Sequence, residues 1–342
     1  MLIRVLLVSL VVSVFLGCSP QEQSGSAEAD KPKPLVVYSS RKEHLIKPLF
    51  DSFTASTGIE VQYITDKAGP LIARLAAEGQ GGPADVLITV DAGNLWQAAQ
   101  QNLLLPADSP VLQERVPASL RDPQNRWFGL SIRSRAIVYS TERTNTDELD
   151  SYESLADPKW AGRLCLRSSK KVYNQSLVAT MIAANGLEQT EKIVGDWVSN
   201  LAVAPFSDDT KVMEAILAGQ CDVGIVNSYY FGRLEKKNPA LALKLFWPNQ
   251  NDRGSHINIS GAGITYSSAN KEAATALIEW MASDDSQQLF MNLNQEYPIN
   301  PAIPLIDSIK AWGDFKMDPI NIAKAGELQA QAVKLMDRAG YK

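Results

Sequence analysis

The chain has 342 residues, of which 33 are Lys or Arg and 38 are Asp or Glu, so its formal net charge is −5. This mild negative charge argues against a nucleic-acid partner, because proteins hold nucleic acids mainly through a basic surface. The 2 histidines and 3 cysteines are too few for a histidine-rich zinc or copper site, or for an iron–sulfur cluster held by four thiolates.

The first 17 residues have the features of a bacterial export signal. One basic residue, Arg4, precedes an apolar stretch at 5–16 that is too short to span a bilayer comfortably. The stretch ends in FLGC, which resembles the lipobox of bacterial lipoproteins, so we expect cleavage before Cys18 and lipid attachment to its thiol. The alternative is a soluble cleaved signal with an incidental cysteine. Residues 18–34 lack large apolar side chains and are expected to form a disordered tether.

From residue 35 onward, strand and helix signals alternate. Short apolar or β-branched runs predict strands at 35–38, 59–64, 86–90, 136–140, 162–166, 202–205, 222–226 and 257–266. Amphipathic stretches predict helices at 42–57, 69–78, 91–101, 173–184, 187–200, 210–217, from 228, 270–282, 286–293 and 319–339. This alternation predicts an α/β fold whose mostly parallel sheets are covered by helices on both faces.

The two series of elements predict two lobes, because the length exceeds the about 250–300 residues at which a single core stops growing. Lobe 1 is expected at 35–132 with about 261–312. Lobe 2 is expected at 133–260 with the C-terminal helix at about 313–342. We expect a monomer with a central cleft between these lobes.

Export also affects the interpretation of Cys165 and Cys221. Both lie in short strand-like runs, and an exported protein is beyond the cytosolic reductants. We therefore expect a disulfide between them. The alternative is two small buried thiols on separate strands.

Three strand-to-helix junctions are candidate functional segments, because ligands of open parallel sheets gather where strands end and helices begin. The junction NSYYFGR, after the strand at 222–226, carries Tyr229 and Tyr230. In the first turn of a helix, these phenols lie about 100° apart and can approach one point. The junction RSSKKVYNQS carries Tyr173 among basic residues, and the junction YSSRKE carries Arg41.

Phenolate is a hard oxygen donor that suits ferric iron, whose charge can displace a phenol proton despite a free pKa of about 10. Three phenolates would balance a 3+ ion and leave positions for water or a small anion. Calcium or magnesium would require carboxylates and carbonyls, which neither tyrosine-bearing junction supplies. Two other interpretations of a tyrosine pair remain, namely packing in a core and lining the pocket of an organic ligand.

From about residue 35 to the C-terminus, the sequence resembles the ferric-ion-binding periplasmic proteins of bacterial iron ABC transporters. The matching stretches are VVYSSRKEHLIKPLFDSFTASTGIEV, ADVLITVDAGNL, KVYNQSLVA and QCDVGIVNSYYFGRL. The resemblance implies that Tyr229 and Tyr230 bind iron, and that Tyr173 matches the third tyrosine of members with a three-tyrosine site. It also implies a bilobed periplasmic-binding-protein fold of type II. Such a protein captures Fe³⁺ in the periplasm and delivers it to an inner-membrane ABC permease.

At the third junction the sequence departs from part of the family. Some members place a His or a His-Tyr pair where this chain has Arg41, and the glutamate that certain members use has no clear match here. A guanidinium can hold an anion beside a helix N-terminus. We therefore expect Arg41, assisted by Arg133, to bind a synergistic anion such as carbonate. The alternative for Arg133 is a salt bridge between the lobes.

Two further expectations concern residues near these junctions. Ser40 and Glu43 match a capping box, so we expect Glu43 to cap the following helix rather than to bind iron. His44 is expected to be a surface histidine or a packing histidine. A further interpretation is an enzyme that uses Cys221 or His256 as a catalytic group. The chain has none of the usual serine-hydrolase, phosphate-loop or His-Glu-x-x-His motifs, so no catalytic activity is expected.

Overall fold

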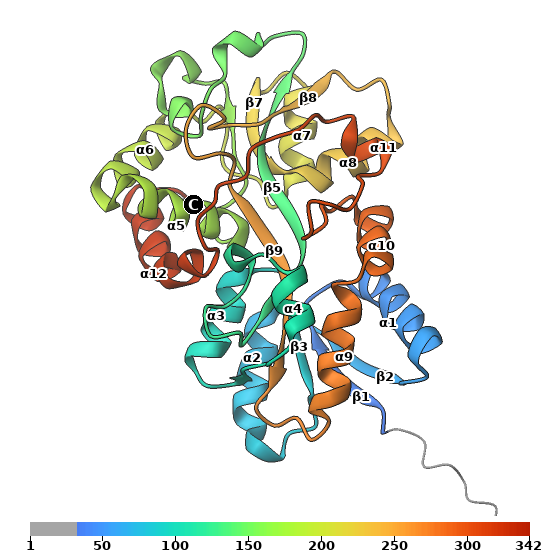
Figure 1. The fold of residues 1–342 in the computed structure, drawn as a ribbon. Helices are drawn as coiled ribbons and strands as arrows, with labels where there is room; N and C mark the ends of the chain where they lie inside the picture. The colour runs from blue at the N-terminus through green and yellow to red at the C-terminus, as the bar shows by residue number, and fades with distance from the viewer. Residues whose placement is uncertain (1–32) are drawn as a thin grey trace, which may run out of the picture. The chain divides into compact units, whose positions relative to one another are not determined.

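The computed structural model describes residues 33–342 (Figure 1). The strands are β1 (Leu35–Ser39), β2 (Val61–Thr65), β3 (Val86–Thr89), β4 (Leu104–Leu105), β5 (Phe128–Ser140), β6 (Leu164–Cys165), β7 (Val223–Asn227), β8 (Leu243–Phe246) and β9 (Ile257–Thr265). The helices are α1 (Glu43–Thr57), α2 (Ala68–Glu78), α3 (Ala92–Gln100), α4 (Pro110–Arg115), α5 (Val172–Asn185), α6 (Leu187–Ser199), α7 (Asp209–Leu217), α8 (Ser228–Lys237), α9 (Lys271–Met281), α10 (Asp284–Asn294), α11 (Asp307–Lys310) and α12 (Ala323–Arg338).

The predicted signal peptide at 1–17, the predicted lipidation site Cys18 and all but the last two residues of the predicted tether lie outside the described residues. Within residues 33–342, the helices are too short or too polar to cross a bilayer.

Strand β5 joins two α/β lobes. The strands follow one order, β2-β1-β3-β9-β5-β7-β6, with β4 beside β9 and β8 beside β5. Residues 128–134 of β5 pair with β9, whereas residues 135–139 pair with β7. The same strand therefore leaves the sheet of the first lobe and enters the sheet of the second (Figure 1). This arrangement is the predicted bilobed α/β fold.

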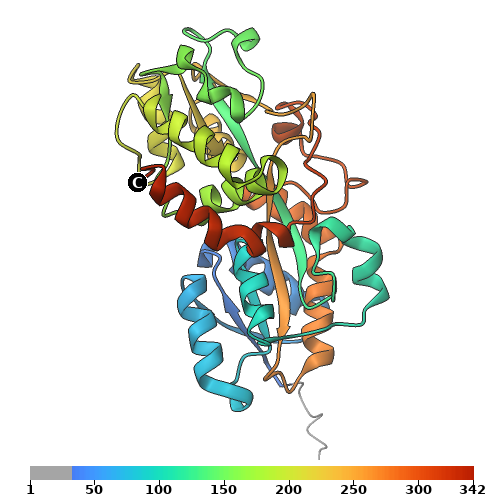
Figure 2. The same ribbon diagram turned by 90° about the vertical axis from the view of Figure 1, so that its left-hand side faces the viewer.

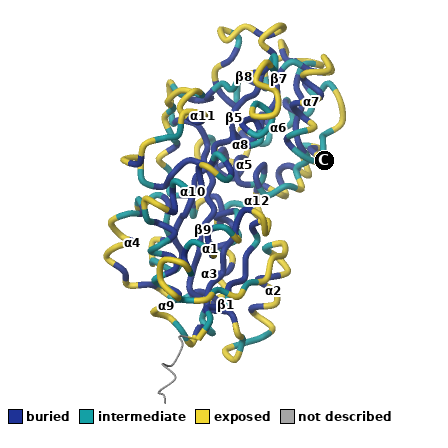
Figure 3. Tube along the Cα trace, turned by 90° about the vertical axis from the view of Figure 1, so that its right-hand side faces the viewer, coloured by how far each residue is buried: buried dark blue, intermediate teal, exposed yellow. Residues whose placement is uncertain are grey.

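The prediction of mostly parallel sheets is wrong. Among the described strands, β1 pairs in parallel with β2 and β3, and β6 pairs in parallel with β7. All pairs made by β5 and β9 are antiparallel. These two long strands are buried at every position and form the centre of the molecule (Figure 3). They carry the chain between the lobes, so they run against the strands that begin each strand–helix unit.

Most predicted elements occur close to the expected positions. Helix α1 buries one apolar stripe, including Leu49 and Phe53, and ends at Gly58, whose φ of 75° favours glycine. The predicted strand at 202–205 is wrong. Only the flanking residues, Leu201 and Phe206, form isolated bridges to neighbouring segments. Within 202–205, Pro205 offers no backbone N–H to a neighbouring strand. Strand β8 was not predicted, and β5 begins eight residues before the predicted strand, at Phe128.

Helix α12 contacts both lobes, packing against α5 and against α3 (Figure 2). A Cβ atom on Gly326 would lie 2.5 Å from the Cβ of Trp96 in α3, so glycine permits this close approach. On the other side, Gln329 donates a hydrogen bond to Gln175 of α5 over 3.3 Å. The sequence-based boundaries group this helix with lobe 2, and those boundaries remain a prediction.

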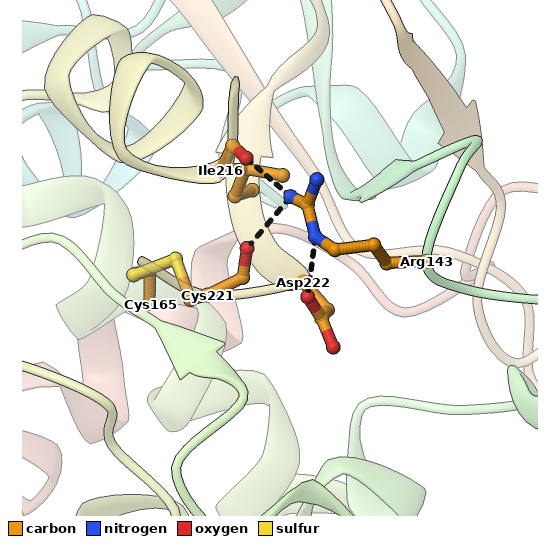
Figure 4. The surroundings of a disulfide bond; sticks show 5 residues. All are labelled: Arg143, Cys165, Ile216, Cys221 and Asp222. Carbon is orange, nitrogen blue, oxygen red and sulfur yellow. Dashed lines mark hydrogen bonds and ion pairs between the residues drawn. A yellow bond between two sulfur atoms is a disulfide. The ribbon is translucent and has the colours of Figure 1, made fainter. Parts of the chain in front are cut away.

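The predicted disulfide between Cys165 and Cys221 is present, with the two Cα atoms 5.9 Å apart (Figure 4). It joins Cys165 of β6 to Cys221, two residues before β7 begins. Arg143 covers this end of the strand, donating to the carboxylate of Asp222 over 2.9 Å and to the carbonyl oxygens of Cys221 and Ile216. The bridge therefore fixes the start of the strand that leads to the tyrosine pair.

Replacing both cysteines, Cys165→Ala with Cys221→Ala, is expected to lower the free energy of unfolding by about 4 kcal/mol. The bridge closes a loop with a sequence separation of 56, and losing it returns the loop-closure entropy to the unfolded chain. Urea denaturation of the iron-free protein measures the change. Dithiothreitol should destabilise wild type and leave the double variant unaffected. Equal midpoints for wild type and variant under oxidising conditions would contradict the expectation.

Candidate metal centre

The three predicted tyrosines lie at the same edge of the second-lobe sheet. Tyr173 is in the first turn of α5, shortly after β6, and Tyr229 and Tyr230 are in the first turn of α8, directly after β7. Strands β6 and β7 are parallel neighbours. The carboxyl ends of parallel neighbours meet at one edge of a sheet, so the pairing brings the two helix N-termini together.

The structure brings the phenols of these tyrosines into one cluster. The Tyr229 hydroxyl donates a hydrogen bond to the Tyr173 hydroxyl over 3.3 Å. The rings of Tyr229 and Tyr230 are stacked, with centroids 4.5 Å apart. Tyr173 and Tyr229 are 6% and 4% exposed, whereas Tyr230 is half-buried and lines a cavity of about 620 Å³. Their assignment as iron ligands remains a prediction.

Positively charged side chains surround the cluster. The guanidinium carbons of Arg133 and Arg167 are each 5.6 Å from the centroid of the Tyr173 ring, and the Lys171 ammonium is 4.7 Å from it. The Arg233 guanidinium carbon lies 5.0 Å from the Tyr229 ring centroid. Cations at these distances are attracted to the faces of aromatic rings and favour an ionised phenol.

Burial nevertheless keeps the phenols of Tyr173 and Tyr229 protonated. It raises the pKa of Tyr229 well above the usual 10, and the neighbouring Tyr173 and Tyr230 raise it further, while Arg133 opposes them. Burial also raises the pKa of Tyr173, against the lowering effect of Arg133. At neutral pH both groups are therefore neutral hydroxyls. A metal that binds them has to displace their protons.

The cleft beside the phenols is lined mainly by basic residues, although the whole protein is acidic. Two cavities of about 600 and 620 Å³ share Lys42 and Lys171. Their basic lining residues are Arg41, Lys42, Lys67, Arg167, Lys170, Lys171, Lys211, Arg233 and Lys237. Their acidic lining residues are Asp66, Asp208 and Glu214. A cleft with this excess of positive charge attracts anions.

Arg41 and Arg133, predicted to bind an anion, both approach a carboxylate that sequence reasoning missed. Arg41 donates to Glu296 over 3.0 Å and to Ser260 over 2.6 Å. Arg133 lies 3.8 Å from Glu296 and donates to Ser260 and to the carbonyl oxygen of Val90. Despite burial, these two arginines lower the pKa of Glu296. The charge of Arg41 is thus compensated inside the protein, whereas the sequence predicted a guanidinium free for an anion.

The predicted capping box of Ser40 and Glu43 is wrong. The Ser40 hydroxyl accepts a hydrogen bond from the backbone of Val90 over 3.0 Å, and Glu43 accepts one from the Tyr63 hydroxyl over 3.2 Å. The chain is extended at Lys42, the residue before α1. The two residues of the motif instead bind Val90, which follows β3, and Tyr63 in the middle of β2. His44 is exposed, which decides between the two predicted positions in favour of the surface.

His256 is a buried structural histidine. One ring nitrogen lies 3.3 Å from the Ser176 hydroxyl and the other lies 3.1 Å from the Thr180 hydroxyl. Burial, with smaller effects of Arg135 and Arg253, lowers the pKa of His256 from 6.5 to about 3. The ring is therefore neutral in the folded protein at the pH values at which it would be protonated in the unfolded chain.

This pKa predicts a loss of stability in acid. Between pH 6.5 and about 3, the unfolded chain binds a proton at His256 and the folded protein does not, so each unit of acidification removes about 1.4 kcal/mol of stability through this group. A His256→Gln variant of the iron-free protein should show a shallower decline between pH 6 and 4, measured by urea denaturation. His44→Gln, which replaces the exposed histidine, is the matched control and should retain the wild-type slope. Equal slopes in all three proteins would contradict the prediction.

The sequence and the fold were compared with those of known proteins. A family model described as bacterial extracellular solute-binding protein matches residues 48–317. The chain is 41% identical over 323 residues to iron uptake protein A1 of Synechocystis, covering 92% of this chain and 90% of that protein.

Two solved structures are also similar to this one. A Trichodesmium protein (IdiA, FutA) in complex with iron and citrate is 41% identical, with a TM-score of 0.87 over 90% of this chain and 100% of that one. Apo FutA2 from Synechocystis is 40% identical, with a TM-score of 0.85 over 90% of this chain and 99% of that one. The similarity extends over both lobes.

Proposed function

The chain belongs to the family of bacterial extracellular solute-binding proteins, and we propose that it captures Fe³⁺ outside the cytoplasm and delivers it to an ABC transporter permease in the inner membrane. Proteins of this family bind and present a solute, so this chain is a binding protein rather than an enzyme. Two similar proteins support iron as the solute, one named for iron uptake and one solved with iron and citrate.

The observation that carries the proposal is the approach of the Tyr229 and Tyr173 hydroxyls to 3.3 Å, with the Tyr230 ring stacked alongside. Tyr173, Tyr229 and Tyr230 bind the metal as phenolates, each losing a proton. Three phenolates balance the charge of Fe³⁺. Uptake therefore releases protons, and acid favours release because protons compete with the metal for the same oxygens.

A small anion, such as carbonate, completes the iron coordination. Arg133 is the better placed of the two predicted anion-binding residues, because its guanidinium faces the Tyr173 ring. Arg41 lines the cavity of about 600 Å³ but lies closer to Glu296 than Arg133 does, at 3.0 Å against 3.8 Å. Lys171 adds positive charge close to Tyr173, and burial with the neighbouring Arg167 lowers the pKa of this lysine. An anion between these groups relieves the repulsion among them and also approaches the metal.

The two lobes close over the iron by bending where β5 and β9 connect them. Lobe 2 supplies the tyrosines and lobe 1 covers them. The protein acts as a monomer held at the membrane by a lipid on Cys18, which leaves the folded part free to reach its permease.

A second candidate function is the binding of an organic or anionic solute, and the basic lining of the cleft favours it. In that case the tyrosines stack on the solute or donate hydrogen bonds to it. Such a solute would stabilise the protein against heat in the absence of metal.

A visible spectrum tests the proposal. The iron-free protein is titrated with ferric citrate, with and without bicarbonate, and a phenolate-to-iron charge-transfer band is expected to appear and to saturate at one iron per chain. Citrate alone and zinc citrate are the controls, and neither should produce the band. If no band appears and citrate alone raises the melting temperature, the proposal of iron as the ligand is wrong and an organic anion is the ligand.

A further inference from the structure

A buried carboxylate lies behind the tyrosine cluster. Asp209, the first residue of α7, is completely buried. It accepts hydrogen bonds from the guanidinium of Arg135 over 2.8 Å, from that of Arg167 over 3.4 Å and from the backbone N–H of Asn227 over 2.9 Å. Asn227 ends β7 and directly precedes α8. The carboxylate thus holds the start of the helix that carries Tyr229 and Tyr230.

The main partner of Asp209 also reaches the other tyrosine helix. Arg135 is 1% exposed, and its second terminal nitrogen donates to the side-chain oxygen of Asn174 over 2.6 Å. Asn174 is the residue after Tyr173. The first terminal nitrogen of Arg135 also lies within hydrogen-bond distance of the Asn227 side chain, at 3.3 Å. One guanidinium therefore contacts a direct neighbour of Tyr173 and the residue that precedes α8.

Asn174 fixes the remainder of its junction. Its side-chain amide donates to the carbonyl oxygens of Arg167 and Ser168, over 2.8 and 3.1 Å, and to the Tyr341 hydroxyl over 2.9 Å. The Tyr341 hydroxyl in turn donates to the carbonyl oxygen of Arg167. The loop that leads into Tyr173 is therefore held by side chains and not only by its own backbone.

We infer that the Arg135–Asp209 pair is a positioning pair that sets the separation between the Tyr173 hydroxyl and the hydroxyls of Tyr229 and Tyr230. This inference rests on the proposed function, in which the three hydroxyls bind one ion. A buried ion pair is seldom the most stable filling of a core, since apolar residues often do as well. What it provides here is directional bonding between β5, the start of α5, the start of α7 and the end of β7, which leads directly into α8.

Asp209 has a second effect on the site. It balances the charge of Arg167, whose guanidinium carbon is 5.6 Å from the Tyr173 ring centroid and 5.8 Å from that of Tyr230. The negative charge of Asp209 compensates the positive charge of Arg167. Arg167 can therefore lie beside the phenols with less repulsion of the cation that the site binds. The same carboxylate therefore controls both the geometry and the field around the hydroxyls.

The test is the Asp209→Asn variant, which keeps the shape of the side chain and removes its charge. Titration with ferric citrate is expected to show an affinity at least about 10-fold weaker, as for other residues that orient metal ligands. The charge-transfer band should also shift in wavelength or lose intensity, which a purely structural role would not cause.

Asp222→Asn is the matched control. Asp222 lies at the opposite end of β7 and pairs with Arg143 over 2.9 Å (Figure 4). It also pairs with Arg163 over 2.7 Å. This variant should lose stability but keep the wild-type affinity and band. Asn174→Leu is the second test variant. It removes the hydrogen bond from Arg135 and those of the side-chain amide, but it leaves the Arg135–Asp209 ion pair in place and should fold even where Asp209→Asn does not. It is expected to change the band in the same direction.

The outcomes separate this inference from the proposed function. A wild-type protein that shows no band overturns the function, and the inference with it. A wild-type band that is unchanged in position, intensity and affinity in both Asp209→Asn and Asn174→Leu overturns the inference alone. The same loss of band in Asp222→Asn as in Asp209→Asn would also overturn it, because the effect would then follow from lowered stability.

Discussion

A Tyr229→Phe variant is expected to bind ferric citrate more than about 100-fold more weakly than wild type, because losing a metal ligand costs more than the 10–100-fold typical of the residues that orient ligands. The change removes one phenolate oxygen and one negative charge from the shell of a trivalent ion. The charge-transfer band should also lose intensity, because one of the three phenolates that produce it is missing. Fluorescence quenching and the visible spectrum, followed during the same titration, measure both effects.

The folded structure should tolerate this substitution. Phenylalanine keeps the ring that stacks on Tyr230, and the hydrogen bond that is lost is the 3.3 Å contact with Tyr173. Tyr139→Phe is the matched control, since Tyr139 is buried at the far end of β5. An affinity within twofold of wild type in Tyr229→Phe would remove this tyrosine from the site, and the same result in Tyr173→Phe and Tyr230→Phe would exclude the phenolate centre.

Glu296→Gln is expected to lower the free energy of unfolding by about 3–5 kcal/mol, the usual cost of removing one partner of a buried ion pair. Glu296 and Arg41 are each 2% exposed at the side chain, and their charged atoms are 3.0 Å apart. Glutamine keeps the volume but leaves Arg41 without its counter-charge, and Arg133 as well. Urea denaturation of the iron-free protein at pH 7.5 measures the change.

The pH dependence of this effect has a definite sign. Arg41 and Arg133 lower the pKa of Glu296 in the folded protein, so the stabilisation is complete above the unfolded pKa of about 4.3 and is lost as the pH falls below it. Asp51→Asn is the control, because Asp51 forms an exposed pair with Lys47 and should change stability by less than about 1 kcal/mol. A similar small change in Glu296→Gln would show that the buried pair contributes little.

Local sequence patterns were sufficient for the tyrosine junctions. Each junction consists of a short apolar run followed by a polar turn and an amphipathic stretch, and this pattern depends on residues within about ten positions of one another. The end of α1 at Gly58 and the first-turn positions of Tyr173, Tyr229 and Tyr230 follow from the same local rules. The disulfide was also predictable, since two strand cysteines in an exported chain have few alternative partners.

Local patterns failed where a residue has two possible partners. Ser40 and Glu43 have the spacing of a capping box, yet they bind Val90 and Tyr63, which the fold places nearby. The antiparallel pairs of β5 and β9 escaped prediction for the same reason, because strand direction depends on where the chain crosses between the lobes. A local motif gives a preference of about 1 kcal/mol, which one hydrogen bond to a residue distant in sequence can match.

What the sequence by itself determined is the set of candidate ligands: three phenols at helix starts with basic neighbours, in a chain that resembles iron-binding proteins. Only the tertiary structure decided which buried charged side chains pair with one another around these phenols. Glu296 meets Arg41 across 255 positions of sequence, and Asp209 meets Arg135 across 74. The energy of a buried charge depends on the whole surrounding medium and on its exact neighbours. Such pairs exist only once β5, β9 and the helices have packed, so only the folded chain reveals them.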